Sequence, residues 1–471
     1  MKTILSLLAA LLPMCLFSQT SMSIENLPNL TSARSAHVQI VTSPEKFVVI
    51  GGHVNGFNLT KNAEIYNSTT KTWQIVTASD NRDMGFVAKL NNGKFLIGGG
   101  CSSTLGVGQL ATTEIYNPVD NSFNAAANMN VARTNVCAAT LKDGRVLVVG
   151  NWYNSANYAE VYNPVNNTFT ATNACLVARA LPLIIPTNDG GAIVCGGLGI
   201  YGGTISQVFE KYDPTTNSFS ELTRTLFNGE TSWNIVCYQP TYSEQLIMPN
   251  GNYAVLVYNS TNTLARLVSI NPATSKIDEI VTQVPIPLQD AQISGLNFGC
   301  QHKIMIDPIR NLIHILQVAL NNTDYILRIV TVNPVNGSVN ATKMDGFDFN
   351  TASCNLSMLS DGRILFTGGN KPDNFTLSPR AFIITPATYT QTGTFTPDEV
   401  KLNAYWDNQK QRFMFNEVVE SATLYSIAGK SLFETQKSRQ LLTNSLQSGV
   451  YIVKVKRLFS NETMTIKVLK P

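Results

Sequence analysis

Four arginines recur at matching places along this 471-residue chain, each a few residues ahead of an apolar segment. They are Arg34, Arg82, Arg133 and Arg179. A guanidinium group is planar, permanently charged and able to form paired hydrogen bonds, which suits carboxylates and sulfates. We interpret the four arginines as candidate ligand-binding residues. The alternative interpretation is that they brace neighbouring elements by bonding to backbone carbonyls or carboxylates.

Aromatic and histidine side chains fall in polar segments that follow apolar ones. These candidates are His53, Trp152, Tyr153 and Tyr201. Sugar sites combine aromatic rings, which pack on the apolar faces of sugars, with polar donors. Together with the arginines, these residues predict a ligand-binding site for glycan, although loop aromatics also occur on surfaces that bind nothing.

Catalysis finds little support in the sequence. The histidines His37, His53, His302 and His314 show no metal-ligand spacing such as His-x-x-x-His, and a structural role is the default for each. The glycine-rich segment 196–203 has no following helix to bind phosphate. No spacing indicates a pair of acidic residues for glycoside cleavage, although two loops could bring such a pair together. We therefore predict no catalytic residue, no metal site and no cofactor.

The strands and turns that must position these residues form a pattern that repeats seven times along the chain. Each repeat carries a short anchor before a polar turn, at Tyr66, Tyr116, Tyr162, Tyr212, Ile270, Val332 and Ile384. The anchors lie 46 to 62 residues apart, a period typical of propellers made of β-sheet blades. Repeat three predicts strands over 135–141, 146–150, 158–162 and 168–172, with the hairpin turn Asp143-Gly144 between the first two.

The order of strands predicts which loops share a face. In an antiparallel four-stranded blade, the segment before the first strand and the loop after the second lie on one side, the top face. The hairpin turns and the anchor turns lie on the opposite side, the bottom face. The candidate arginines and aromatics should therefore gather at the top face.

Paired glycines end several of the second strands, at 51–52, 98–100, 196–197 and 368–369. An aromatic residue follows the anchor turn, at Trp73, Phe123, Phe169 and Phe219. Glycine allows close backbone approach between neighbouring blades.

This pattern resembles the kelch motif over about residues 30 to 395. The resemblance implies an all-β, galactose-oxidase-like propeller with seven blades, or six if a weak repeat is something else. Residues 19 to 33 are expected to add an outer strand that helps to close the ring. Kelch propellers include copper enzymes that need tyrosine and histidine ligands with a modified cysteine, and no such set can be placed here.

Residues 396–471 follow a different pattern of alternating strands, which predicts a small β-sandwich. Three stretches, 425–432, 446–455 and 465–470, resemble the C-terminal sorting domain of the type IX secretion system of Bacteroidota. The resemblance implies export across the outer membrane, with the type IX machinery as a partner. An ordinary β-sandwich is the alternative.

The N-terminal residues 1–18 read as a cleaved secretory signal, with Lys2 ahead of a short apolar stretch. Residues 19–395 would then form the propeller. The seven cysteines after the signal fit small buried residues better than a disulfide framework. Charged residues are 14% and the net charge is +3, which argues against a nucleic-acid partner, and no later segment is apolar enough to span a membrane.

These observations predict a monomeric, secreted or surface-attached propeller that binds glycan or an extracellular protein through its top face. One alternative is a secreted carbohydrate-active enzyme on the same scaffold. The other is a structural or adhesion protein without a small ligand.

Overall fold

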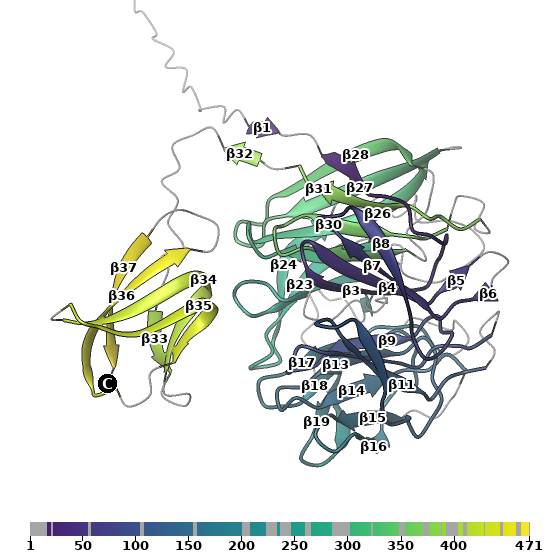
Figure 1. The fold of residues 1–471 in the computed structure, drawn as a ribbon, viewed down its shortest axis with the longest axis horizontal. Coiled ribbons are helices and arrows are strands. Elements are labelled where there is room, and N and C mark those ends of the chain that lie inside the picture. The colour runs from purple at the N-terminus through teal and green to yellow at the C-terminus, as the bar shows by residue number, and fades with distance from the viewer. Residues whose placement is uncertain are drawn as a thin grey trace, which may run out of the picture. The chain divides into compact units, whose positions relative to one another are not determined.

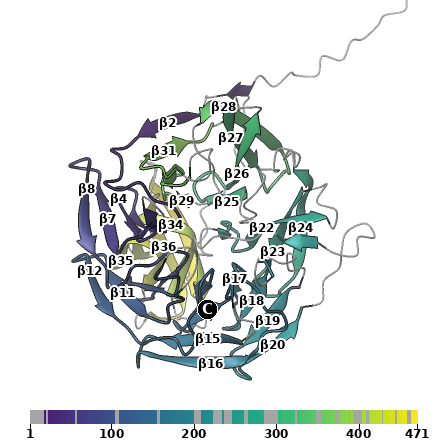
Figure 2. The ribbon, with the colours of Figure 1, turned by 90° about the vertical axis from the view of Figure 1, so that its right-hand side faces the viewer.

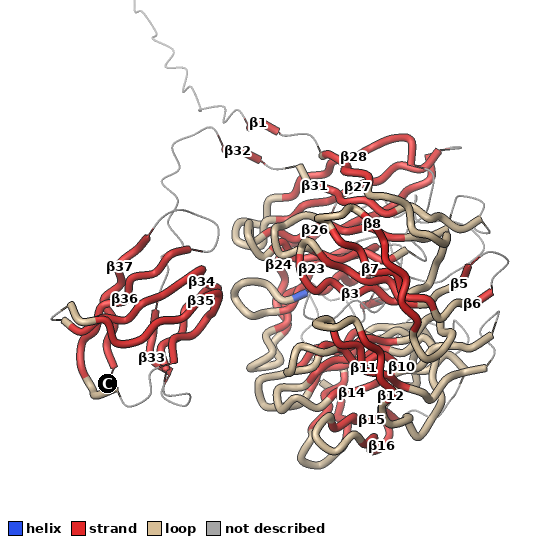
Figure 3. Tube along the Cα trace, in the orientation of Figure 1, coloured by secondary structure: helices blue, strands red, loops and turns tan. Residues whose placement is uncertain are grey.

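A computed structural model of the chain describes residues 17–19, 22–54, 58–103, 108–153, 158–199, 208–222, 233–235, 246–259, 265–284, 302–321, 324–347, 354–370, 376–387, 389–391, 404–407, 412–427, 429–442, 446–457 and 463–470. Strands dominate this part of the chain (Figure 3). The chain divides into two compact units, residues 20–388 and residues 1–19 with 389–471. The all-β class expected from the sequence is confirmed.

The first unit contains seven four-stranded antiparallel sheets within its described residues, one for each predicted repeat. Repeats one and two form β3 (Val38–Ser43), β4 (Lys46–Ile50), β7 (Asn62–Asn67) and β8 (Thr72–Thr77), then β9 (Phe86–Lys89), β10 (Phe95–Gly98), β11 (Thr113–Asn117) and β12 (Ser122–Ala125). Repeats three and four form β13 (Cys137–Thr140), β14 (Val146–Val149), β15 (Tyr158–Asn163) and β16 (Thr168–Ala174), then β17 (Leu183–Pro186), β18 (Ala192–Cys195), β19 (Glu210–Asp213) and β20 (Ser218–Glu221).

The remaining three sheets have the same order, with longer second and fourth strands in repeats five and six. These two repeats form β21 (Trp233–Ile235), β22 (Tyr253–Asn259), β23 (Ala265–Ile270) and β24 (Ile277–Val284), then β25 (His302–Asp307), β26 (Leu312–Asn321), β27 (Asp324–Val332) and β28 (Val339–Phe347). Repeat seven forms β29 (Asn355–Met358), β30 (Ile364–Thr367) and β31 (Ala381–Thr385). Its fourth strand is β2 (Ser23–Asn26), which comes from the other end of the chain.

The sheets stand around a centre, with the first strand of each repeat inside and the fourth outside (Figure 2). The second strands are the most apolar, and the residues of β10, β14, β18 and β30 are all buried. Their side chains pack between neighbouring sheets, so the core is shared from one repeat to the next. This packing is what expels water from a propeller and holds its sheets together.

The anchor residues close their turns through side chains as well as the backbone. The hydroxyl of Tyr162 donates to Asn167 Oδ1 at 3.1 Å, and Tyr162 packs on Phe169 at 4.9 Å between ring centroids. Asn167 adopts a φ of 55°, which asparagine tolerates better than most residues. Repeats two and four repeat the hydroxyl contact, and repeats one, two and four repeat the aromatic pair.

The two ends of the first unit meet in the seventh sheet. β2 pairs with β31 in an antiparallel register that sets Ser23 opposite Thr385. This confirms that an early outer strand helps to close the ring.

Buried polar groups join the first and seventh sheets at this closure. His37 Nε2 lies 2.8 Å from Thr367 Oγ1, and Gln39 donates to the same hydroxyl at 2.7 Å. Ser357 donates to Gln39 Oε1 at 2.6 Å. All four side chains are buried, so a shift between the two sheets would leave polar groups without partners. These hydrogen bonds therefore fix the alignment of the first sheet with the seventh.

The second unit contains a five-stranded sheet made of β33 (Ala404–Asp407), β34 (Arg412–Ser426), β35 (Ser431–Leu442), β36 (Gly449–Arg457) and β37 (Thr463–Lys470). The early residues of β34 pair with β33, and its later residues pair with β36. A core that includes Phe413, Leu424 and Val455 lies within this unit. The unit also holds the short pair of β1 (Phe17–Gln19) and β32 (Tyr389–Gln391), shown with the rest of the fold in Figure 1.

The five cysteines in the described residues are all buried, as expected for small core residues, namely Cys101, Cys137, Cys175, Cys195 and Cys354. Within the part of the chain that the structure describes, no helix is long and apolar enough to cross a bilayer.

Candidate functional site

The four predicted arginines lie inside the fold and not on its surface. Their exposed fractions are 0% for Arg34, 1% for Arg82 and Arg133, and 2% for Arg179. Each guanidinium forms an ion pair with a buried glutamate of its own repeat, namely Glu64, Glu114, Glu160 or Glu210. Each also donates to the carbonyl of the glycine that directly follows the second strand of that repeat.

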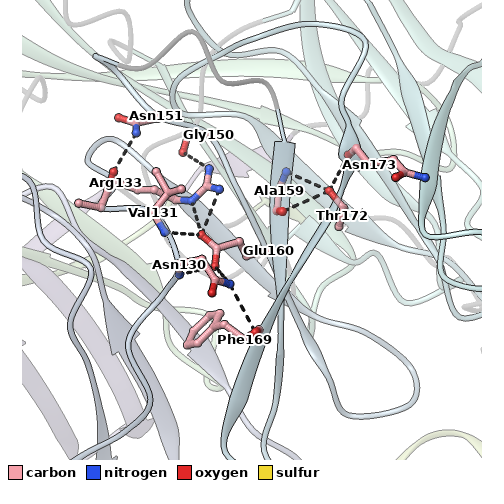
Figure 4. A network of polar contacts seen from close by, with 11 residues as sticks. Asn130, Val131, Arg133, Gly150, Asn151, Ala159, Glu160, Phe169, Thr172 and Asn173 are labelled. Carbon is pink, nitrogen blue, oxygen red and sulfur yellow. Dashed lines mark hydrogen bonds and ion pairs between the residues drawn. The ribbon is translucent and has the colours of Figure 1, made fainter.

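Repeat three shows this arrangement in full (Figure 4). Arg133 donates through Nε and Nη2 to Glu160 Oε1, both at 3.2 Å, and through Nη1 to the carbonyl of Gly150 at 3.3 Å. The other oxygen of Glu160 accepts the backbone N–H of Asn130 at 2.6 Å. Asn130 and Arg133 lie in the top-face segment before the first strand, and Glu160 lies in the third strand. The pair therefore holds that segment against the third strand.

The backbone of each arginine segment contacts the preceding repeat. The N–H of Gly52 donates to the carbonyl of Arg82 at 2.8 Å, and that of Gly100 donates to Arg133 at 2.7 Å. A side chain at Gly51, where φ is 65°, would collide with the carbonyl of Arg82. The close backbone approach expected at the paired glycines is confirmed.

The expectation that these arginines face a ligand differs from what the structure shows. Their charges are neutralised by glutamate and their donors are directed to carbonyls of the same repeat, while their own backbone carbonyls accept hydrogen bonds from the preceding repeat. We call these four residues brace arginines. The missed signal is a glutamate two residues before each tyrosine anchor, in Glu64-Ile-Tyr66 and its three counterparts. Burial raises the pKa of Glu210 and Arg179 opposes that shift, which is the balance expected of a desolvated pair.

His53 lies at the top face, where the other predicted residues were expected. It begins the short hairpin of β5 (His53–Val54) and β6 (Asn58–Leu59), which follows the second strand of repeat one. Its Nε2 lies 2.7 Å from Oδ2 of Asp83, the residue directly after the brace Arg82. The His53 side chain is 12% exposed and that of Asp83 is 1% exposed, so the imidazole connects a buried carboxylate with the surface.

Asp83 is fixed from its other side by Cys101. The backbone N–H of Cys101 donates to the Asp83 carbonyl at 3.1 Å and approaches Asp83 Oδ1 at 3.2 Å. Burial raises the pKa of the Cys101 thiol to about 11, so the thiol stays protonated at neutral pH. Cys101 therefore holds Asp83 through its backbone and is not suited to act as a nucleophile.

Trp152 and Tyr153 lie on the equivalent loop of repeat three and are both partly exposed. The N–H of Trp152 donates to the carbonyl of Thr134 at 3.1 Å, and its ring packs against the core shared by repeats three and four. The N–H of Tyr153 donates to Asn151 Oδ1 at 3.3 Å. Tyr201 lies outside the described residues.

The repeats place His53, Cys101 and Trp152 at one equivalent position. Each follows the second glycine of its repeat or the residue that replaces it, and each bonds to the residue after the brace arginine of its own repeat. His53 and Trp152 therefore occupy equivalent positions in repeats one and three. Cys101 occupies the same position in repeat two.

The described residues do not form a cluster of three or more histidine, cysteine, aspartate or glutamate side chains that could hold a metal ion. His37 contacts Thr367, His53 contacts Asp83, and His314 contacts Thr331 at 2.9 Å in repeat six. Because these three histidines have separate partners and belong to no ligand cluster in the described part of the chain, they do not fit a copper site with histidine ligands.

No protein-family model matches the chain, and no curated protein matches it. Among solved structures, the chain is similar to a fungal alcohol oxidase of the AA5 family in complex with copper. The TM-score is 0.55 at 13% identity, over 96% of this chain and 99% of the oxidase. This likeness confirms the galactose-oxidase-like β fold that the kelch resemblance implies.

Proposed function

We propose that this protein is an extracellular enzyme that acts on carbohydrate through the top face of its ring of sheets. The observation that carries the proposal is the contact between the partly exposed His53 and the buried Asp83. Imidazole is the side chain best suited to exchange a proton near neutral pH, and a carboxylate partner orients it.

Trp152 and Tyr153 would provide the binding surface for the sugar. Both lie on the top-face loop of repeat three, where their partly exposed rings can pack on a pyranose face. The buried arginines do not contribute, because their charges are taken by glutamate. The copper of the similar oxidase is not part of the proposal.

A second candidate is glycan or protein binding without catalysis, which Trp152 and Tyr153 favour by themselves. Two variants of the full chain distinguish the enzyme from the binding protein. His53→Gln should abolish turnover and leave binding within about threefold. Trp152→Ala should weaken both, because stacking on one aromatic residue contributes about 0.5–1.5 kcal/mol beyond the area it buries.

The test is a panel of soluble polysaccharides followed by chromatography for new products and by calorimetry for binding. Turnover that His53→Gln removes would support the enzyme. Binding without turnover would replace the enzyme with the second candidate. No response from any polysaccharide would favour a structural or adhesion role.

We also propose that the second unit is the export address of the type IX secretion system. In support, the three stretches that carry the resemblance lie on β34 and β35, on β36 and on β37, which are neighbouring strands of one sheet. A chain that ends at residue 396 should remain inside the cell envelope. Normal arrival of that chain at the cell surface would contradict the assignment.

A further inference from the structure

Six acidic residues are fully buried in the described part of the chain, and five of them have an arginine partner. Glu64, Glu114, Glu160 and Glu210 pair with the brace arginines, and Asp307 pairs with Arg310 at 2.6 Å. Asp83 is the exception, since its ion-pair partner among the described residues is His53.

The choice of histidine has a physical consequence. A buried carboxylate is costly unless an opposite charge lies beside it. Arginine meets this need permanently, whereas histidine does so only while it is protonated. The other five acidic residues have arginine partners, and Asp307 also lies 3.8 Å from Nε2 of the buried His314. The Asp83–His53 pair differs from that contact because the His53 side chain is 12% exposed and can meet a substrate.

The pair also breaks the internal symmetry of the ring. At the position of His53, repeats two, three and four carry Cys101, Trp152 and Leu198. At the position of Asp83, repeats one, three and four carry Ser35, Thr134 and Ala180. The repeated scaffold therefore does not require an acid or a histidine at either position.

The two groups that flank Asp83 in the described residues, the guanidinium of Arg82 and the thiol of Cys101, are already engaged. Arg82 is directed to Glu114 and Asp80, and the Cys101 thiol stays protonated. The brace arginines cannot pair with the carboxylate or sulfate of an acidic sugar. The site is therefore better suited to a neutral glycan.

We propose that His53 is the proton-transfer residue of the top-face site, that Asp83 is its positioning residue, and that the substrate is a neutral glycan. This inference rests on the proposed function. Neutral His53 accepts a proton from a water molecule as the water oxygen bonds to the anomeric carbon of the glycan. The imidazolium, held by Asp83, returns that proton to the glycosidic oxygen as its bond to the same carbon breaks.

The first test needs no substrate. Diethylpyrocarbonate modifies neutral imidazoles, and peptide mass spectrometry reports each histidine separately. Asp83→Asn removes the carboxylate that lies 2.7 Å from Nε2 of His53, so the imidazole is no longer held by that contact and its modification rate should rise severalfold. Buried His37 and His314 are internal controls for folding, because their modification would report unfolding.

Asp213→Asn is the matched control. Asp213 lies in the anchor turn of repeat four, where repeats one, two and three already carry asparagine. This variant should leave the His53 rate unchanged. A His53 rate in Asp83→Asn within twofold of the unmodified protein would overturn the pair, whatever the protein does to glycans.

A second measurement does not depend on the variant folding. Dextran, a soluble xylan and a mannan are added in turn to the unmodified full chain. Protection of His53 by at least one of them, about fivefold or more, would support the site. Protection by sulfated dextran alone would overturn the assignment of a neutral glycan.

Turnover separates this inference from the proposed function. On a glycan that the protein converts, Asp83→Asn should lower kcat about 100-fold with KM within twofold, and should move the limb of the pH profile that reports the base to lower pH. A lower kcat with an unmoved profile would assign Asp83 a structural role and overturn the inference. If Asp83→Asn changes the His53 rate but no glycan is converted, the proposed function fails while the coupled pair stands.

Discussion

Repeats one to four and repeats five and six build the same four-stranded sheet with different interactions. The first group places a glutamate two residues before the anchor and pairs it with a buried arginine. The second group places Val268 and Val330 at that position, within longer strands and a shared aliphatic core. The sheet itself therefore does not need the ion pair.

The difference shows what the braces add. The second oxygen of each glutamate accepts the N–H of the residue three positions before the arginine, at Thr31, Ser79, Asn130 and Leu176. A brace therefore fixes the top-face segment of its repeat as well as the sheet. Asp83 follows a brace arginine directly, so the candidate site lies on a segment that a brace fixes.

The largest effect should follow from breaking one brace. Glu160→Gln leaves the buried charge of Arg133 without a partner, and we expect a loss of about 3–5 kcal/mol in the free energy of unfolding. Urea denaturation of the full chain measures this loss, with the exposed Glu221→Gln as the control.

The double variant Arg133→Leu with Glu160→Leu sharpens the same comparison. It gives repeat three the apolar chemistry of repeat six, and it should lose less stability than Glu160→Gln alone. A larger loss in the double variant would show that the brace contributes net stability, and the comparison between the two groups would need revision.

A core truncation in repeat six should cost nearly as much. Ile315 is fully buried in β26 within the aliphatic core, so Ile315→Ala should lower stability by about 2–5 kcal/mol. The control is Val335→Ala, because Val335 is 80% exposed in the anchor turn of the same repeat. Equal effects of the two variants would contradict the role assigned to the core.

The closure between repeats one and seven should respond to acid. Burial holds the pKa of His37 well below 6.5, and the positive charges of Arg34 and Lys303 lower it further. Below about pH 6.5 the unfolded chain therefore binds one proton more than the folded protein, and stability should fall as the pH falls, by up to about 1.4 kcal/mol per pH unit.

The measurement is urea denaturation at several pH values between about 7 and 5, on the full chain and on His37→Gln. The variant should be less stable at neutral pH and should show a shallower dependence on pH. Identical slopes for the two proteins would assign the acid sensitivity to other groups.

The smallest effect concerns the anchor turn. Tyr162→Phe removes the hydroxyl that donates to Asn167, so we expect a loss of about 0.5–1.5 kcal/mol. Tyr66→Phe is the matched control, because residue 71 of repeat one is a lysine where the other tyrosine anchors have asparagine. A loss from Tyr66→Phe as large as that from Tyr162→Phe would show that the hydroxyl contact is not the cause.

Local patterns in the sequence predict most of the fold. The Asp143-Gly144 turn, the apolar second strands and the anchor turns each depend on neighbouring residues, and the repeat carries them from one sheet to the next. The strands of repeats five and six are predicted as well, although their paired glycines are absent.

The candidate site is harder to predict because it depends on contacts between residues that are far apart in the sequence. Nothing next to Arg133 in the sequence shows that it is buried, since its partner Glu160 lies 27 residues away in the same repeat. The contact between His53 and Asp83 spans a similar separation and joins repeat one to repeat two. An alignment of the repeats with each other would have revealed both, through the glutamate before each tyrosine anchor and through the unusual residues at positions 53 and 83.

The strand β2 has a consequence for the order in which the molecule is made. The seventh sheet combines the first ring strand to be synthesised with three of the last, so the ring stays open until about residue 385 has been added. Until then His37 and Gln39 lack the partners that later come from repeat seven. The export proposed above would gain from this delay, because closure of the ring is postponed until the last repeat is free to fold.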